Sequence, residues 1–102
     1  MKPCCKQYLD EQFGGDADMV NEIYGEYASS MQEKAQEAVT ALAGASWEIL
    51  DRVAHTIKGN ALAAGDNEMA QLGIELRQAA KLQDAVQSAS LIEGIKAMTQ
   101  EL

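Results

Sequence analysis

The fold of this chain is decided by residues 46–66, SWEILDRVAHTIKGNALAAGD. Apolar residues recur in this stretch at three- and four-residue steps, which is the period of an amphipathic α-helix. Ser46 suits the N-cap position, while Gly65 and Asp66 supply a stop followed by the cap of another helix. The stretch therefore predicts a helix starting at Trp47 whose buried face is formed by Leu50, Val53, Ala54, Ile57, Ala61 and Ala64.

The residues before this stretch predict a longer helix and a short one. Apolar positions follow the helical period from residue 16 to residue 43, with Asp16 as the N-cap and Gly44 suited to the C′ position. The pair Gly14-Gly15 separates this long helix from residues 5–13. Residues 5–13 predict a short helix that packs across one end of the molecule through Tyr8, Leu9 and Phe13.

Two further helices are expected after Asp66. The third long helix ends near Lys81, and Asp84 offers the cap of the last one. The expected stripe of the last helix is Ala85, Ala89, Ile92, Ile95, Met98 and Leu102. Four amphipathic helices with short connections predict an all-α fold, an up-and-down antiparallel four-helix bundle with a short additional N-terminal helix. Residues 1–102 are expected to form this single domain.

Composition narrows the class of function. The 102 residues carry a net charge of −8, which disfavours nucleic acid and anionic lipid surfaces as ligands. No apolar run approaches the roughly 20 residues that cross a bilayer, so we expect a soluble cytoplasmic protein, a monomer that does not bind membranes. Cys4 and Cys5 could bind a metal or sense redox state, but reduced thiols near a chain end are the simpler interpretation.

His55 is the only histidine, and the helical projection turns it outward. It lies about 160° around the helix from Ile57, the centre of the apolar stripe. A core histidine would not be placed there. The residues expected around it on the helix surface are Glu48, Asp51, Arg52, Lys58, Gly59 and Leu62.

The neighbours of His55 suit a phosphoryl carrier. An exposed imidazole is largely neutral near pH 7, so a ring nitrogen can attack phosphorus. Lys58, three residues later, can neutralise phosphoryl oxygens, and Gly59 clears room for the backbone of another molecule. The chain has no Gly-rich phosphate loop and no acidic cluster for magnesium, so we expect no cofactor, no metal site and no autonomous kinase activity. Magnesium would come with the partner.

Residues 54–61, AHTIKGNA, closely resemble the phospho-acceptor motif of histidine-containing phosphotransfer (HPt) domains, Ala-His-x-Leu-Lys-Gly followed by small residues. The resemblance continues through Gly65, Leu72 and Gly73. It implies that His55 accepts a phosphoryl group from an aspartyl-phosphate receiver domain and passes it to a response regulator. The implied partners are receiver domains and a hybrid sensor histidine kinase, which would dock on the helix of His55, including Asp51, Arg52, Gly59 and Leu62.

One position departs from the family pattern. Relatives often carry a polar residue, commonly glutamine, that hydrogen-bonds the imidazole from the following helix, and here Arg77 stands at that place. Arg77 could contact the phosphoryl oxygens instead, while Glu75, Gln71 or Gln78 orients the ring. Asn60 also replaces the usual Ser or Ala, a change that we expect the fold to tolerate.

Two other classes of function are alternatives to phosphotransfer. A helical adaptor that binds partners independently of phosphorylation would keep the same bundle, and binding unaffected by His55→Ala would favour it. An acidic carrier of covalently attached pantetheine needs an Asp-Ser-Leu serine at the start of a helix, and this sequence has none.

Overall fold

A computed structural model describes all 102 residues of the chain, which contains five helices and no strands. The helices are α1 (Pro3–Gln12), α2 (Ala17–Ala43), α3 (Trp47–Ala63), α4 (Asn67–Lys81) and α5 (Ala85–Gln100). The predicted all-helical fold is confirmed. The short first helix begins at Pro3 rather than Cys5, because proline is favoured in the first turn of a helix, where its missing N–H is not needed.

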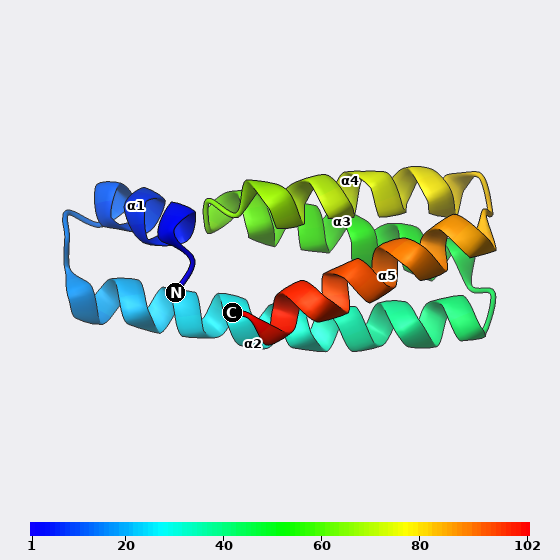
Figure 1. Cartoon of the computed structure of the whole chain (residues 1–102), viewed down its shortest axis with the longest axis horizontal. Coiled ribbons are helices and arrows are strands. Elements are labelled where there is room, and N and C mark those ends of the chain that lie inside the picture. The colour runs from blue at the N-terminus through cyan, green and yellow to red at the C-terminus, as the bar shows by residue number, and fades with distance from the viewer.

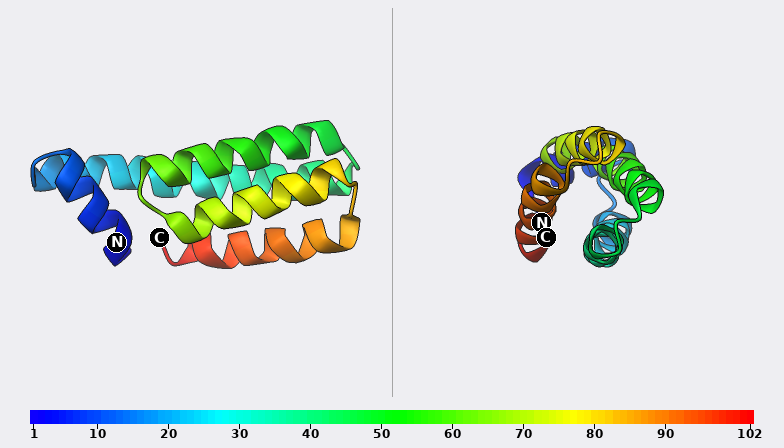
Figure 2. Two further views of the ribbon diagram at one scale, coloured as in Figure 1. Left: turned by 90° about the horizontal axis from the view of Figure 1, so that it is seen from above. Right: turned by 90° about the vertical axis from the view of Figure 1, so that its right-hand side faces the viewer.

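The long helix α2 sets the length of the molecule. Its 27 residues span about 40 Å at 1.5 Å per residue, close to the longest dimension of 42 Å. Helices α3, α4 and α5 run up and down beside its C-terminal part, and α1 folds back over its N-terminal part (Figure 1). Figure 2 shows from two further sides that the chain ends lie close together. The most extensive helix contact joins α3 to α4.

The core contains the apolar face predicted for α3, with all six of its stripe residues buried. The prediction for α5 was wrong in part, because Ala85 and Ala89 are exposed and α5 instead buries Ser88 and Leu91. Alanine gives a weak signal here, since exposing one methyl group costs little. The buried face of α5 consists of Ser88, Leu91, Ile92, Ile95 and Thr99.

The turns between helices use residues in the left-handed region of backbone conformation. Gly65, between α3 and α4, has φ +74°. Between α2 and α3 that conformation falls on Ala45 (φ +50°) and not on the predicted Gly44 (φ −89°). A left-handed non-glycine residue costs about 1 kcal/mol. The cap of α3 also differs from expectation, because the Ser46 side chain makes no capping hydrogen bond.

Helix α1 is fastened to the bundle through the turn that follows α3. The carboxylate of Asp66 is fully buried, caps α4 at the Met69 N–H, and accepts hydrogen bonds from Tyr27 and Lys2, each at 2.7 Å. A side chain at Gly65 would collide with Tyr8, its Cβ lying only 2.4 Å from the Cβ of Tyr8. These contacts seat α1 on the α3–α4 turn.

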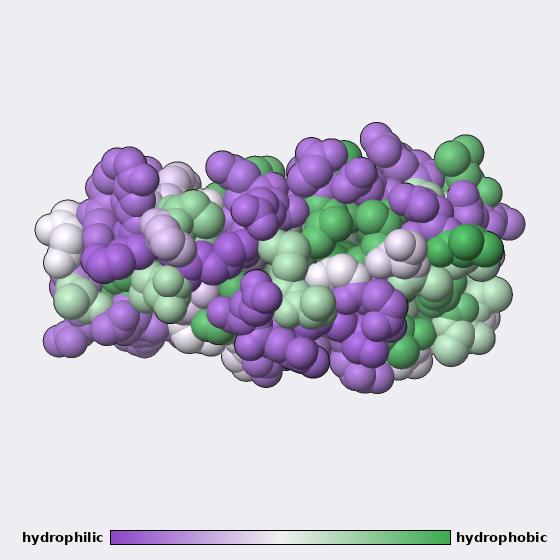
Figure 3. Space-filling model, viewed as in Figure 1, coloured by the Kyte–Doolittle hydropathy of each residue, from purple (hydrophilic) through white to green (hydrophobic).

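The surface is mostly polar, with a few exposed apolar side chains. Figure 3 shows hydrophobic residues gathered toward the end of the bundle where α4 turns into α5, and Leu82 and Val86 at that turn are 79% and 84% exposed. Phe13, which was expected to pack across one end of the molecule, is instead exposed, because it lies at the α1–α2 turn beyond the four-helix part. None of the helices is both long and apolar enough to span a membrane.

Candidate functional site

His55 lies midway along α3 and is exposed, as the helical projection predicts. The opposite side of the same helix is anchored by Ile57 and Ala54, which are fully buried. The imidazole therefore projects from a helix whose position the core fixes. Its environment comes from α3 itself and from α4, the helix packed most closely against α3.

Arg77 of α4 connects two residues of α3. Its Nε donates to Oδ1 of Asp51 at 3.0 Å, and its Nη1 lies 3.3 Å from Nδ1 of His55. Asp51 and His55 stand four residues apart on one face of α3, so a single guanidinium reaches both. The other residues of α4 that could have oriented the imidazole do not do so, since none of Gln71, Glu75 and Gln78 hydrogen-bonds it.

Gly73 explains how α4 comes close enough for this contact. A Cβ at Gly73 would lie 2.9 Å from the backbone N of Lys58 and 3.1 Å from the carbonyl O of Ala54. Both atoms belong to the turns of α3 that surround His55. Only glycine leaves room for this approach, and Arg77 follows one turn later on the same face of α4.

A basic hollow lies next to this array. It has a volume of about 200 Å³ between α3 and α4, and its lining includes Lys58, Arg77 and Lys81. Three of the eight basic residues of the chain therefore line one small hollow of a protein with net charge −8. Lys58 was expected here from the sequence, whereas Lys81, near the end of the next helix, was not.

The ion pairs show which positive charges are available to a partner. Five of the eight basic residues pair with carboxylates, and Arg52, Lys58 and Lys81 do not. All three lie on α3 or α4, the helices that present His55 and Arg77. The unpaired positive charge of the molecule is thus concentrated on the helix pair that carries the histidine.

The remaining residues predicted for partner docking share this side of α3. Gly59 is exposed, with no atom within 4 Å of the place where a Cβ would stand, and Leu62 is 48% exposed. Arg52 is exposed too. Asp51 differs from them, because its carboxylate is 28% exposed and is engaged by Arg77. Together these residues make an open, mixed surface around His55, which we call the relay face.

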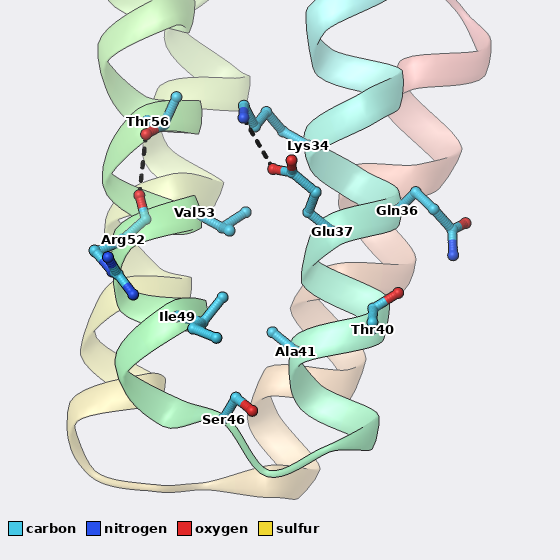
Figure 4. A pocket seen from close by; sticks show the side chains of 10 residues that line it. All are labelled: Lys34, Gln36, Glu37, Thr40, Ala41, Ser46, Ile49, Arg52, Val53 and Thr56. Atoms are coloured by element: carbon cyan, nitrogen blue, oxygen red, sulfur yellow. Dashed lines mark hydrogen bonds and ion pairs between the residues drawn. The ribbon is translucent and has the colours of Figure 1, made fainter.

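The largest hollow of the molecule is elsewhere. It encloses about 500 Å³ between α2 and α3, near the turn that joins them. Figure 4 shows Ile49 and Val53 of α3 facing Ala41 of α2 across it, with the Lys34–Glu37 ion pair on the α2 side. No nucleophilic histidine or cysteine lines this groove, so its size alone suggests no chemistry.

The two cysteines of α1 and the buried tyrosines of α2 lie near Asp66, at the C-terminal end of α3. Cys5 is buried and Cys4 exposed, both as free thiols. Burial, reinforced by the nearby charge of Asp66, raises the pKa of the Cys5 thiol to about 12. Burial and the hydrogen bond to Asp66 also raise the pKa of Tyr27. No group of three or more His, Cys, Asp or Glu side chains is arranged to hold a metal ion.

Asn60 and Asp66 have roles that the sequence did not reveal. The side-chain amide of Asn60 donates to the Ser30 hydroxyl at 3.1 Å and so links α3 to α2. Asp66 was predicted only as a helix cap, but it also anchors Tyr27 and Lys2. These hydrogen bonds cannot be read from one sequence, because the partners are 30, 39 and 64 positions away.

Comparison with known proteins identifies the family. The family model described as Hpt domain matches residues 22–102, which contain helices α3, α4 and α5 and most of α2. Searches of curated proteins and of solved structures gave no match. The family functions generally in histidine phosphotransfer within phosphorelays. On its match over most of the chain and on its helical bundle, this protein belongs to the Hpt domain family.

Proposed function

We propose that His55 is the phospho-acceptor of a two-component phosphorelay, taking a phosphoryl group from the aspartyl phosphate of one receiver domain and passing it to a response regulator. The observation that carries the proposal is the concentration of unpaired positive charge around the only histidine. Arg52, Lys58 and Lys81 all belong to the two helices that form its surroundings.

Phosphoryl transfer depends mainly on in-line positioning and on neutralising the charge of the equatorial oxygens. His55 offers an exposed ring nitrogen, and the basic hollow beside it offers the charge. In the proposed step, Nε2 of His55 forms a bond to phosphorus while the bond from phosphorus to the aspartate oxygen of the partner breaks. The aspartate leaves as a carboxylate. Magnesium and the acidic pocket that holds it belong to the receiver in this scheme.

The proposed partners are receiver domains, including that of a hybrid sensor histidine kinase. Receivers present a negatively charged site, and the unpaired cations Arg52, Lys58 and Lys81 would attract it against the overall charge of −8. Gly59 leaves space for backbone to approach, and Leu62 offers an apolar contact beside it. The protein itself acts as a carrier that depends on its partners for the kinase reaction.

The test is to incubate the protein with a panel of radiolabelled, phosphorylated receiver domains and follow the label. The wild type should gain label that is lost in acid, as expected of a phosphoramidate. The variant His55→Gln should gain none while keeping its helical circular dichroism. Label on the folded variant would refute the proposal, and a folded wild type that takes label from no receiver would favour the adaptor function.

A further inference from the structure

We infer that Arg77 controls the protonation of the His55 ring: it holds Nδ1 unprotonated, which disfavours the nucleophilic form of the free histidine and protects the phosphorylated form. This inference deepens the proposed function and rests on it where it concerns the phosphorylated ring. It starts from one contact, between Nη1 of Arg77 and Nδ1 of His55 at 3.3 Å.

A guanidinium has N–H donors and no acceptor. A hydrogen bond from Arg77 therefore requires a lone pair on Nδ1 of His55. In a neutral imidazole with a lone pair on Nδ1, the proton is on Nε2. The contact thus selects the Nε2–H tautomer of the free protein. A glutamine at position 77 could instead accept a proton from Nδ1 through its side-chain oxygen, which is the opposite selection.

Asp51 orients the guanidinium of Arg77 toward the His55 ring. Its Oδ1 accepts from Nε of Arg77 at 3.0 Å, so the guanidinium is held at one edge while another edge faces the ring. Arg77 and Asp51 are both only partly exposed, at 36% and 28%. Gly73 brings the backbone of α4 against α3 one turn away, which places the base of the Arg77 side chain within reach of both Asp51 and His55.

The selected tautomer cannot attack phosphorus through Nε2, because that nitrogen carries the proton. Attack requires a ring with its proton on Nδ1 and its lone pair on Nε2, and this ring would point an N–H at the guanidinium. Arg77 must therefore leave Nδ1 before transfer. The phosphoryl group of a docked receiver would give the guanidinium an anionic partner instead, in the hollow that Arg77 lines together with Lys58 and Lys81.

After transfer the preference is reversed in favour of the product. Formation of the Nε2–P bond leaves a proton on Nδ1, and its release to water restores the Nδ1 lone pair. That lone pair can accept from Arg77 again. Hydrolysis breaks the N–P bond most readily when Nδ1 is protonated, because the ring then leaves as neutral imidazole rather than as an anion. By occupying Nδ1, Arg77 should lengthen the lifetime of the phosphorylated protein.

The experiment combines a spectroscopic reading with a lifetime. Nitrogen-15 NMR of the histidine ring assigns the proton to Nδ1 or Nε2 in the unphosphorylated protein at alkaline pH, where free imidazole is neutral. The wild type should show the Nε2–H tautomer, and Arg77→Gln should shift the population toward Nδ1–H. Arg77→Lys, which still offers only donors, should restore the wild-type tautomer.

The lifetime is measured after phosphorylation with the small-molecule donor phosphoramidate. Arg77→Gln should lose its phosphoryl group roughly three- to ten-fold faster than the wild type, the factor expected for one partly exposed, charge-assisted hydrogen bond. Lys96→Gln is the matched control, because it removes one positive charge from α5, where Lys96 pairs with Glu93. Its tautomer and its lifetime should equal those of the wild type.

Each outcome bears on a different claim. A wild type with its proton on Nδ1, or an unchanged tautomer in Arg77→Gln, overturns the role of Arg77. A shifted tautomer with an unchanged lifetime overturns the protective part. If the tautomer shifts but phosphoramidate labels no variant at His55, the proposed function fails and the protective role fails with it, while the control of the free ring by Arg77 is upheld.

Discussion

Two ion pairs, Lys2–Asp66 and Arg77–Asp51, lie near opposite ends of α3, and they differ in burial. Lys2–Asp66 joins α1 to the start of α4 with a carboxylate that is 0% exposed, whereas the Arg77–Asp51 pair is roughly one-third exposed. The buried carboxylate has every partner inside the protein, namely Lys2, Tyr27 and the Met69 N–H. In the partly exposed pair, Nη1 of Arg77 remains directed at His55.

The comparison separates a structural use of charge from a chemical one. A buried carboxylate that loses its partners is costly, so the Asp66 cluster acts as a fixed joint. A partly exposed pair contributes little to stability and can exchange its partners at low cost. That second property suits a surface on which a phosphoryl group arrives and departs. Substitution of Asp66 should therefore lower the free energy of unfolding strongly, and substitution of Asp51 only slightly.

The largest effect is expected from Asp66→Ala. It removes three hydrogen-bond acceptor contacts at once and leaves the Tyr27 hydroxyl buried without a partner, so the free energy of unfolding should fall by about 3–5 kcal/mol. Asp51→Ala is the matched control and should cost at most about 1 kcal/mol. Urea denaturation of both variants measures the difference. Equal losses for the two would contradict the contrast in burial.

The next effect is a loss of stability at alkaline pH that arises only at the Asp66 end. Burial raises the pKa of Cys5 from 9.0 to about 12, and burial and Asp66 raise that of Tyr27. The folded protein therefore keeps protons that the unfolded chain releases, so stability is fully present below pH 9 and declines as pH rises toward 12. Denaturation midpoints measured from pH 8 to pH 11 test the sign. Cys5→Ala should reduce the slope, and a midpoint that rises with pH would contradict the account.

The smallest effect on stability and the most selective effect on docking are expected from Gly59→Glu. The new side chain meets open space, so stability should change by no more than about 1 kcal/mol, and glutamate forms helix more readily than glycine. Its bulk and negative charge on the relay face should slow transfer from receivers by roughly ten-fold or more.

Gly25→Glu on α2 provides the control for that change. Gly25 is also an exposed helical glycine with open space around its Cβ position, but it lies on another helix. Its transfer rate should match the wild type. Equal rates for the two glutamate variants would remove Gly59 from the docking surface.

The sequence was sufficient for the features that depend on local periodicity. The order of the helices, the buried stripe of α3 and the outward direction of His55 all follow from residue spacing, and the structure confirms them. Sequence spacing was weakest for α5, where alanines gave little contrast between the two faces.

Features that depend on contacts between distant helices could not be predicted. The bond between Arg77 and His55 crosses from α4 to α3, and the motif resemblance identified position 77 without saying what an arginine does there. Lys81 reaches the same hollow from the last turn of α4. The Asp66 cluster depends on how α1 folds back over the bundle, which no local pattern encodes.

The central claim is that His55 carries a phosphoryl group from one partner to another, and a two-step transfer tests it most directly. The protein is labelled from a phosphorylated receiver, freed of that receiver and mixed with a second receiver and magnesium. The account predicts that label leaves the wild type and appears on the aspartate of the second receiver, while His55→Gln transmits none. Transmission by folded His55→Gln, or label that stays on the wild type with every receiver, would contradict it.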